Sequence, residues 1–302
     1  DLPMDFAGAR DAIAREEPDV LIYLEVGSNQ LMYALPFARL APVQCVLGGF
    51  PVTTGIPNMD YFLSSRDIEP PNAQDAYSET LVELSSVVGA MSRPPLTLPL
   101  KTRKELGLPD NGERLYACPA QLFKLHPDLD AAFSTILSRD PKARILLFDA
   151  KTNLLQNALT RRFALTMPLE RQQRILFMPY VPRDEFMHML RAVDAVMDSY
   201  YVSFGTVAML AVAAGAPFVT WPGPYFCGRT GYRLFSCMDI PELMAKTHEE
   251  YVEIALRLAQ DKAFYRQAAD KIAARSDQFF DNYTIMDEFA ECLKSLYAKA
   301  IQ

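Results

Sequence analysis

Two segments of this sequence carry residues that can contact a ligand, and each follows a short apolar run. In residues 48–57, Gly48 and Gly49 leave room for backbone N–H groups to approach a bound molecule. Farther along the chain, Gln121 and Lys124 precede a helical pattern, where a lysine can reach a phosphate group. A plain turn and a solvated surface lysine are the alternatives to these two interpretations.

A third segment has residue types suited to a nucleobase. Tyr180, Val181, Arg183 and Phe186 follow another apolar run and open an amphipathic stretch. Backbone amides and carbonyls at this place can read the edge of a base, while Arg183 or Phe186 can cover its face. A capped helix start without any ligand is the alternative interpretation.

Two further segments can bind a diphosphate. Gly205 and Thr206 open an apolar stretch and are predicted to lie at a helix N-terminus. Unpaired N–H groups, a hydroxyl and the positive end of the helix dipole favour a phosphate there. Arg229 lies in a loop after a later apolar run, where its guanidinium can pair with a phosphate.

The elements that position these residues follow from the alternation of short apolar runs with longer amphipathic stretches. This alternation is typical of βαβ units and a parallel sheet, in which ligands bind beyond the carboxyl ends of the strands. We predict strands at residues 20–26, 43–50, 61–64, 115–119, 145–148, 175–179, 195–198 and 217–221. We predict helices at residues 31–40, 128–138, 184–193 and 286–300, and a helical, charged stretch after Asp239 through Ser276. Prolines between the third and fourth strands place a linker near residues 92–110.

Composition narrows the classes of function. The net charge of −7 and the absence of a Lys/Arg cluster in the sequence argue against a nucleic-acid partner. The apolar runs fall short of the roughly 20 residues that a membrane span needs, so we expect a cytoplasmic protein. The five cysteines are odd in number and lack metal-ligand spacing, so neither a disulfide scaffold nor a zinc site is expected.

Five collinear stretches resemble the catalytic region of the O-linked N-acetylglucosamine transferase family, which is glycosyltransferase family 41, including its bacterial relatives. They read RLAPVQCVLGGFPVTTGIPNMDYFLSS, YACPAQLFKLHPDLDAAFSTILSRDP, ILFMPYVPRDEF, MDSYYVSFGTVAMLAVAAGAPFVTWPG and PELMAKTHEEYVEIALRLAQD. The resemblance covers nearly the whole chain. It implies an α/β fold of the GT-B type with two Rossmann-like lobes.

The resemblance also implies an organisation of the chain. Residues 1–100 would form the C-terminal part of the N-terminal lobe, and residues 101–280 the lobe that binds the nucleotide-sugar. Residues 281–302 would form a helix that packs back on the N-terminal lobe, because its apolar positions need a partner surface. Since the chain starts at Asp1 without a methionine, we expect it to be part of a longer protein. The resembled family implies helical tetratricopeptide repeats upstream of it.

The activity implied is transfer of an N-acetylglucosamine-like sugar from a UDP-linked donor, without a metal cofactor and with inversion, to a Ser, Thr or Asn side chain of a protein. By the same resemblance, Lys124 would be catalytic and would stabilise the charge on the departing UDP oxygen. The other matching positions would bind the diphosphate (Gln121, Gly205, Thr206), the uracil (Tyr180, Val181, Arg183) and the donor sugar (Gly48, Gly49).

Four positions depart from the pattern of the resembled family. Leu210 stands where the family carries an acidic residue that holds the ribose hydroxyls, and Val207 replaces a second threonine. Phe204 and Val52 each replace a glycine. These departures leave open a nucleotide such as CMP or GDP, or a nucleotide-sugar-binding module without turnover. A further alternative with the same architecture is a nucleotide-sugar epimerase or a transferase to a small or lipid-linked acceptor. The three histidines fall in stretches predicted to be helical, and none is assigned as a general base.

Overall fold

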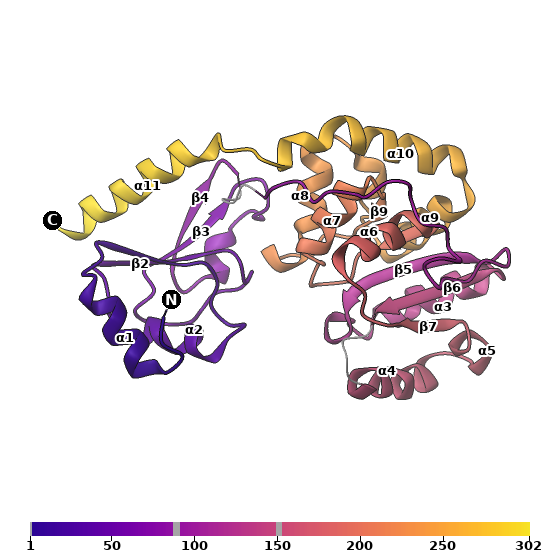
Figure 1. The fold of residues 1–302 in the computed structure, drawn as a ribbon, viewed down its shortest axis with the longest axis horizontal. Coiled ribbons are helices and arrows are strands. Elements are labelled where there is room, and N and C mark those ends of the chain that lie inside the picture. Colours follow the sequence, from indigo (N-terminus) through magenta and orange to yellow (C-terminus); the bar gives the residue numbers. More distant parts are fainter. Residues whose placement is uncertain (1, 87–90, 149–152) are drawn as a thin grey trace. The chain divides into compact units, whose positions relative to one another are not determined.

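The structure is a computed structural model that describes residues 2–86, 91–148 and 153–302 (Figure 1). Internal contacts divide the chain into two units, and each unit contains one parallel sheet. Unit 1 consists of residues 1–90 and 282–302, and unit 2 of residues 91–281. The prediction of an α/β fold with two parallel sheets is therefore confirmed.

The boundary between the units falls at residue 91. Met91 forms a parallel β-bridge with Phe280, and the N–H of Asp281 donates to the Met91 carbonyl at 3.0 Å. Residues 91–100 therefore belong with unit 2, whereas the sequence prediction placed them in the first lobe.

Unit 1 is built on four strands that follow one another in the sheet as they do in the chain. The strands are β1 (Val20–Tyr23), β2 (Val43–Leu47), β3 (Tyr61–Ser65) and β4 (Thr80–Leu84). All three pairings are parallel, with Val20 opposite Val43 and Cys45 opposite Tyr61. Every connection therefore steps to the next strand in the same direction.

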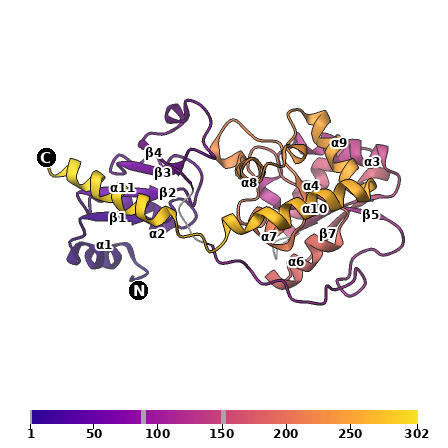
Figure 2. The same cartoon turned by 90° about the horizontal axis from the view of Figure 1, so that it is seen from above.

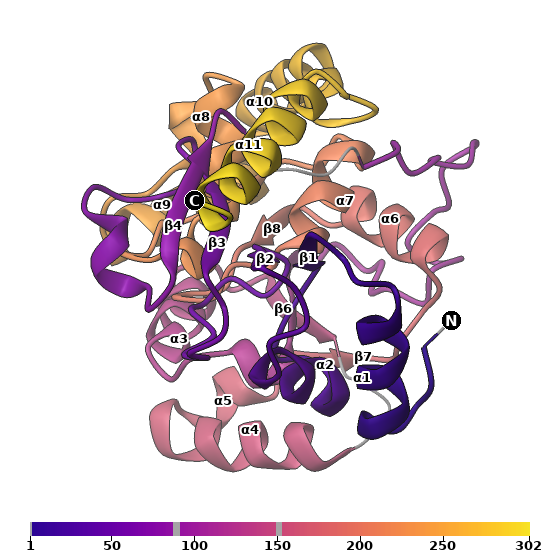
Figure 3. The ribbon, with the colours of Figure 1, turned by 90° about the vertical axis from the view of Figure 1, so that its left-hand side faces the viewer.

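Helices cover both faces of this sheet. Figure 3 shows α11 (Ile285–Ala300) on one face, and α1 (Phe6–Arg15) and α2 (Gln30–Ala34) on the other. Leu296 of α11 packs into a cluster with Val43, Cys45 and Leu63. The C-terminal helix is thus part of unit 1, although it follows unit 2 in the sequence.

Two helical features of unit 1 differ from the prediction. The helix predicted at residues 31–40 ends at Ala34, and the 3₁₀ helix η1 (Leu35–Phe37) follows it. Pro36 has no N–H to donate, so the α-helical pattern cannot continue through it. Helix α1 was not predicted; it begins after Asp5, whose carboxylate caps it by accepting the N–H of Gly8 at 2.8 Å.

Unit 2 has a five-stranded parallel sheet whose order is β7-β6-β5-β8-β9. The strands are β5 (Arg114–Gln121), β6 (Ala143–Phe148), β7 (Ile175–Met178), β8 (Ala195–Met197) and β9 (Phe218–Val219). From β5 the chain builds outward through β6 to β7, and then returns to place β8 on the other side of β5. The centre of β5 is fully buried, as expected for a parallel sheet covered on both faces.

The helices of unit 2 divide between the two faces of this sheet. Figure 2 shows α3 and α9 on one side and α6 and α7 on the other, and contacts within each pair agree. The α-helices are α3 (Leu129–Arg139), α4 (Asn153–Thr166), α5 (Leu169–Gln172), α6 (Arg183–Ala192), α7 (Thr206–Ala214), α8 (Thr230–Cys237), α9 (His248–Gln260) and α10 (Lys262–Arg275). Short 3₁₀ helices are η2 (Ala73–Ala76) in unit 1, and η3 (Leu122–Lys124), η4 (Phe226–Gly228), η5 (Pro241–Leu243) and η6 (Ser276–Phe279) in unit 2. No helix in the described part of the chain combines the length and apolar character required to cross a membrane.

Candidate functional site

The strand order of unit 2 identifies the place where a ligand is expected. Strands β5 and β8 are neighbours, with Tyr116 opposite Ala195, but the chain leaves them toward helices on opposite faces. In open α/β sheets, ligands bind beyond the carboxyl ends of the strands at this switch of direction. Gln121 ends β5 and Lys124 follows it, and Gly205 and Thr206 follow β8, so the structure brings these four predicted residues to the switch.

Lys124 connects the two loops that meet at the switch. It ends η3, is half-buried, and its Nζ donates a hydrogen bond to the Ser203 carbonyl at 3.3 Å. Burial lowers the pKa of Lys124, while the negative charge of Asp198 acts in the opposite direction. The ammonium of Lys124 is therefore held beside the turn that leads into α7.

The start of α7 offers N–H groups to an anion. Gly205 caps the helix with φ 53° and ψ −116°, a backbone conformation that glycine alone adopts without strain. Among the described residues, the N–H groups of Gly205 and Thr206 have no hydrogen-bond acceptor. The N-terminus of a helix with open N–H groups favours a phosphate.

A third loop, after β9, packs against the turn before α7. The N–H of Ser203 donates to the Cys227 carbonyl at 2.8 Å, and Cys227 Sγ lies 3.3 Å from the Tyr201 carbonyl oxygen. A Cβ atom at Gly228 would lie 2.9 Å from that same oxygen, so this contact requires glycine. Arg229 follows directly: its guanidinium lies 4.2 Å from the ring centre of Tyr232 and donates to the Gly223 carbonyl at 3.3 Å.

The segment predicted to contact a base lies after β7, at the edge of the sheet. Tyr180 is 68% exposed, and Val181 packs partly against the core. Arg183 is the first residue of α6, and the ring of Phe186 meets the ring of Phe148 edge to face at 5.4 Å. Two strand spacings separate β7 from β5, about 10 Å, so this segment and Lys124 can contact only an elongated ligand together.

Gly48 and Gly49 lie in unit 1, at the carboxyl end of β2. A Cβ atom at Gly49 would lie 2.4 Å from the Leu24 carbonyl oxygen, so close approach of two loops already requires a glycine there. Farther along the same loop, Thr53 Oγ1 donates to Glu79 Oε2 at 2.7 Å, and the Thr54 N–H donates to Glu79 Oε1 at 2.7 Å. These threonines thus hold a buried carboxylate of their own unit.

Sequence reasoning missed the residue that organises the turn before α7. Asp198, which directly follows β8, is 1% exposed and accepts four hydrogen bonds. Burial raises the pKa of Asp198 to about 6, although hydrogen bonds from Ser203 and Thr220 act in the opposite direction. A signal was present in the sequence, since an acidic residue directly after an apolar strand is rarely buried without partners.

A second cluster near Lys124 also escaped prediction. Tyr201 has φ 66°, unusual for a bulky residue, and its hydroxyl donates to Asp128 Oδ2 at 2.6 Å. The ring of His126 lies edge to face against Tyr201 at 4.6 Å. His126 stands in the loop between η3 and α3, so the prediction that it falls in a helical stretch is wrong. Pro127 follows it, and a residue before proline is disfavoured in the helical conformation.

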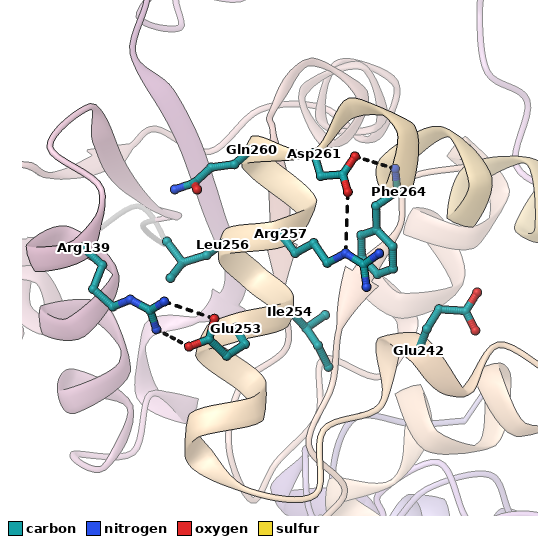
Figure 4. Close-up of a pocket in the computed structure, with 9 residues that line it drawn as sticks. All are labelled: Arg139, Glu242, Glu253, Ile254, Leu256, Arg257, Gln260, Asp261 and Phe264. Atoms are coloured by element: carbon teal, nitrogen blue, oxygen red, sulfur yellow. Dashed lines mark hydrogen bonds and ion pairs between the residues drawn. The ribbon is translucent and has the colours of Figure 1, made fainter.

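A pocket of about 480 Å³ lies elsewhere on unit 2, over the C-terminal half of α9 (Figure 4). Four of its charged side chains pair with one another, Arg139 with Glu253 and Arg257 with Asp261, and Glu242 pairs with Lys271. Helix α9 begins beside Tyr200, after β8, and runs away from there toward this pocket. The pocket is therefore separate from the loops that follow β5 and β8.

Comparison with known proteins identifies the family. The family model described as "Glycosyl transferase family 41" matches residues 85–286, two thirds of the sequence. The chain belongs to glycosyl transferase family 41. Within the described chain, this family region contains all of the predicted unit 2 site residues, whereas Gly48 and Gly49 precede it.

Curated relatives match most of this chain. A "Probable UDP-N-acetylglucosamine--peptide N-acetylglucosaminyltransferase SPINDLY" from Solanum lycopersicum is 26% identical over 251 residues, which cover 82% of this chain and 26% of the relative. The corresponding SEC protein of Arabidopsis thaliana is 26% identical over 280 residues, which cover 85% and 27%. The chain thus spans about a quarter of the length of these curated relatives.

Solved structures show the same architecture. An O-GlcNAc transferase mutant from Thermobaculum terrenum superimposes with a TM-score of 0.82 at 24% identity, covering 99% of this chain and 56% of that one. The structure of TarM gives a TM-score of 0.58 at 12% identity, covering 95% and 57%. These likenesses confirm the GT-B fold predicted for this family 41 chain.

Proposed function

We propose that this chain is the catalytic region of a transferase that moves an N-acetylglucosamine-like sugar from a UDP-linked donor to a protein side chain. One observation carries the proposal: in a family 41 chain, Lys124 and the open N–H groups at the start of α7 meet at the switch between β5 and β8. The SPINDLY and SEC relatives are described as transferring N-acetylglucosamine to peptides, which supports the donor and the acceptor class.

The chemistry follows from where charge develops. An acceptor oxygen of Ser or Thr, or the amide nitrogen of Asn, attacks the anomeric carbon as the bond from that carbon to the UDP oxygen breaks. Attack from the opposite side inverts the configuration, UDP leaves with the electron pair, and the proton of the acceptor is released to solvent. Lys124, together with the N–H groups of Gly205 and Thr206, stabilises the growing diphosphate charge. Gln121, at the end of β5 and three residues before Lys124, contributes polar contacts to the diphosphate.

The nucleoside would extend from the switch toward the edge of the sheet. The segment after β7 would contact the base through Tyr180, Val181 and Arg183, with Phe186 beneath them against Phe148. Arg229 would act on the phosphates from the loop after β9. Lys124 and the helix start neutralise the diphosphate without a divalent cation, so we propose that no metal cofactor is required.

Leu210 favours a second candidate, a module that binds a nucleotide-sugar without turnover. The aliphatic side chain of Leu210 has no oxygen to accept hydrogen bonds from ribose hydroxyls. At 8% exposure it packs in the core cluster of unit 2 instead. The same replacement is compatible with a nucleotide other than UDP.

The test is a set of calorimetric titrations of the chain with UDP, GDP and CMP, with and without EDTA, followed by single-turnover assays with UDP-N-acetylglucosamine and a protein acceptor. The proposal predicts that UDP binds most tightly, that EDTA leaves its Kd unchanged, and that sugar is transferred. Binding of UDP without release or transfer of the sugar would favour the module. Binding that is lost in EDTA and restored by Mg²⁺ would contradict the metal-free proposal.

A further inference from the structure

The carboxylate of Asp198 gathers hydrogen bonds from both ends of the turn that leads into α7. Oδ1 accepts the N–H groups of Ser199 at 2.9 Å and Phe204 at 3.0 Å. Oδ2 accepts the hydroxyls of Ser203 at 2.7 Å and Thr220 at 2.8 Å. Since Thr220 follows β9, one buried carboxylate holds the turn closed and fastens it to the neighbouring strand.

The same turn carries the groups that face the switch. The carbonyl of Ser203 accepts a hydrogen bond from the Lys124 ammonium, and the N–H of Ser203 donates one to the Cys227 carbonyl. The bond from the Phe204 N–H to Asp198 sets the position of Gly205, which is the next residue and caps α7. Removing the carboxylate would therefore free the acceptor of Lys124 and the helix start together.

The charged form of Asp198 also interacts electrostatically with Lys124. The titratable groups that act on it come from three elements: Lys124 on η3, Cys118 on β5 and Tyr251 on α9. Burial raises the pKa of both Cys118 and Tyr251, so they are neutral, and Lys124 is the cation among the three. A buried carboxylate with four neutral donors still benefits from a nearby positive charge.

We propose that Asp198 is the positioning residue of the phosphate site: it holds the turn formed by residues 199–204 so that Lys124 and the N–H groups of Gly205 and Thr206 converge on one anion. This inference rests on the proposed function in that the anion is the diphosphate of the donor. Asp198 acts through the turn and does not touch the substrate.

Two substitutions separate the shape of this side chain from its charge. In Asp198→Asn, the amide oxygen can accept the two backbone N–H groups, and the amide nitrogen can donate to the Ser203 and Thr220 hydroxyls, which accept as well as donate. In Asp198→Ala, all four bonds are lost. Asp140→Asn is a matched control, because Asp140 is a fully buried acid of unit 2 that is bonded to Arg114 and Tyr116 at the start of β5.

The experiment measures amide hydrogen exchange by NMR and the binding of UDP, pyrophosphate and uridine by calorimetry. For Asp198→Ala we expect exchange at Phe204 to accelerate at least tenfold, and UDP and pyrophosphate to bind at least tenfold more weakly, with uridine unchanged. Asp198→Asn should stay within about threefold of wild type in exchange and in UDP binding, because the turn is retained. Should Asp198→Ala not fold, Thr220→Val removes a single bond and should shift the same quantities in the same direction by less.

Wild-type protection at Phe204 in a folded Asp198→Ala variant would overturn the inference, as would an equal loss of UDP binding in Asp140→Asn. If wild-type protein binds neither UDP nor pyrophosphate, the proposed function fails. The exchange measurement, which needs no ligand, then still decides whether Asp198 holds the turn.

Discussion

The two units of this chain use the same parallel α/β construction and differ in how their strands are ordered. In unit 1 the order β1-β2-β3-β4 follows the chain, so no two neighbouring strands send their loops to opposite faces. In unit 2 the chain returns to add β8 beside β5, and that reversal brings two loops together at one edge. The proposed diphosphate site of unit 2 therefore rests on strand order rather than on the presence of a glycine-rich loop.

Each unit also buries an acid that fastens a loop, and the two acids behave differently. Glu79 precedes β4, at the amino end of its sheet, and accepts hydrogen bonds from the hydroxyls of Thr53 and Thr54. Burial alone raises the pKa of Glu79, but the hydrogen bonds from Thr54 and Thr53 outweigh it and hold the pKa below its usual value. Asp198, at the carboxyl end of β8, has its pKa raised to about 6. Glu79 thus fastens a loop within unit 1, whereas Asp198 fastens the turn that leads to the open N–H groups at the start of α7.

The largest effect is expected at Lys124. Lys124→Ala should lower single-turnover transfer about a hundredfold or more, since one preorganised electrostatic contact to the leaving group is lost. The melting temperature of this variant should stay within a few degrees of wild type. The hydrogen bond that is lost, from the Lys124 ammonium to the Ser203 carbonyl, is long at 3.3 Å and contributes little to stability. Lys142→Ala, an exposed lysine before β6, is the control and should transfer normally. Equal activity in the two variants would mean that the switch of unit 2 does not stabilise the leaving diphosphate.

The pH dependence of stability should separate the two buried acids. The folded pKa of Asp198 lies above its unfolded value, so its contribution to stability is complete below about pH 4 and is lost as the pH rises toward 6. Glu79, with a lowered pKa, contributes stability above its unfolded pKa and loses it as the pH falls. Between pH 4 and 7, Asp198→Asn should therefore gain about 3 kcal/mol of unfolding free energy relative to wild type.

Glu79→Gln should change in the opposite sense. Its unfolding free energy should be below that of wild type at neutral pH, and this difference should shrink as the pH falls. Urea denaturation at several pH values measures both differences. Parallel curves for wild type and Asp198→Asn would show that Asp198 has an ordinary pKa in the folded protein.

A smaller effect is expected at two glycines with left-handed backbones. Gly205 and Gly55 have φ of 53° and 67°, and an added Cβ meets no atom within 4 Å at either. Alanine should therefore destabilise each unit through backbone strain alone, by about 1–3 kcal/mol. UDP binding should weaken about tenfold in Gly205→Ala and stay unchanged in Gly55→Ala. Calorimetry on both variants measures these affinities. Loss of UDP binding in Gly55→Ala would indicate that the diphosphate is contacted by unit 1 and not by unit 2.

The smallest effect concerns the base segment. Arg183→Ala should raise KM about threefold to tenfold and change kcat little, because a base contact is made equally in the ground and transition states. Arg161→Ala, an exposed arginine of α4, is the matched control. Steady-state kinetics with varied donor concentration separates the two parameters. A fall in kcat at constant KM would assign Arg183 to the chemical step instead.

Much of this comparison could be predicted from the sequence, and the missing parts have physical reasons. Apolar runs located eight of the nine strands in the described chain, all except β4, because parallel strands buried on both faces must be apolar. The same runs do not reveal strand order, so the switch between β5 and β8 could not be derived from them. Gly205 and Thr206 were found because a glycine before an apolar helix is a local signal.

Asp198 was missed because one of its four partners is remote, although Ser199, Ser203 and Phe204 are close to it in sequence. Thr220 is far away in sequence, and its bond to Asp198 exists only once β8 and β9 pair. The position of Asp198 after an apolar strand was a signal, but the fastening of the turn to β9 could not be predicted from it. Likewise, the sequence contains Glu79 without any sign that Thr53 and Thr54 fold back to it.

The central claim is that the switch of unit 2 binds the diphosphate, and a ¹⁵N NMR titration of the chain with UDP tests it most directly. We predict that the amides of Gln121, Lys124, Gly205 and Thr206 shift together and saturate with one Kd, while Thr54 and the strands of unit 1 stay unchanged. Shifts confined to the loops of unit 1, with those of unit 2 unmoved, would contradict the account.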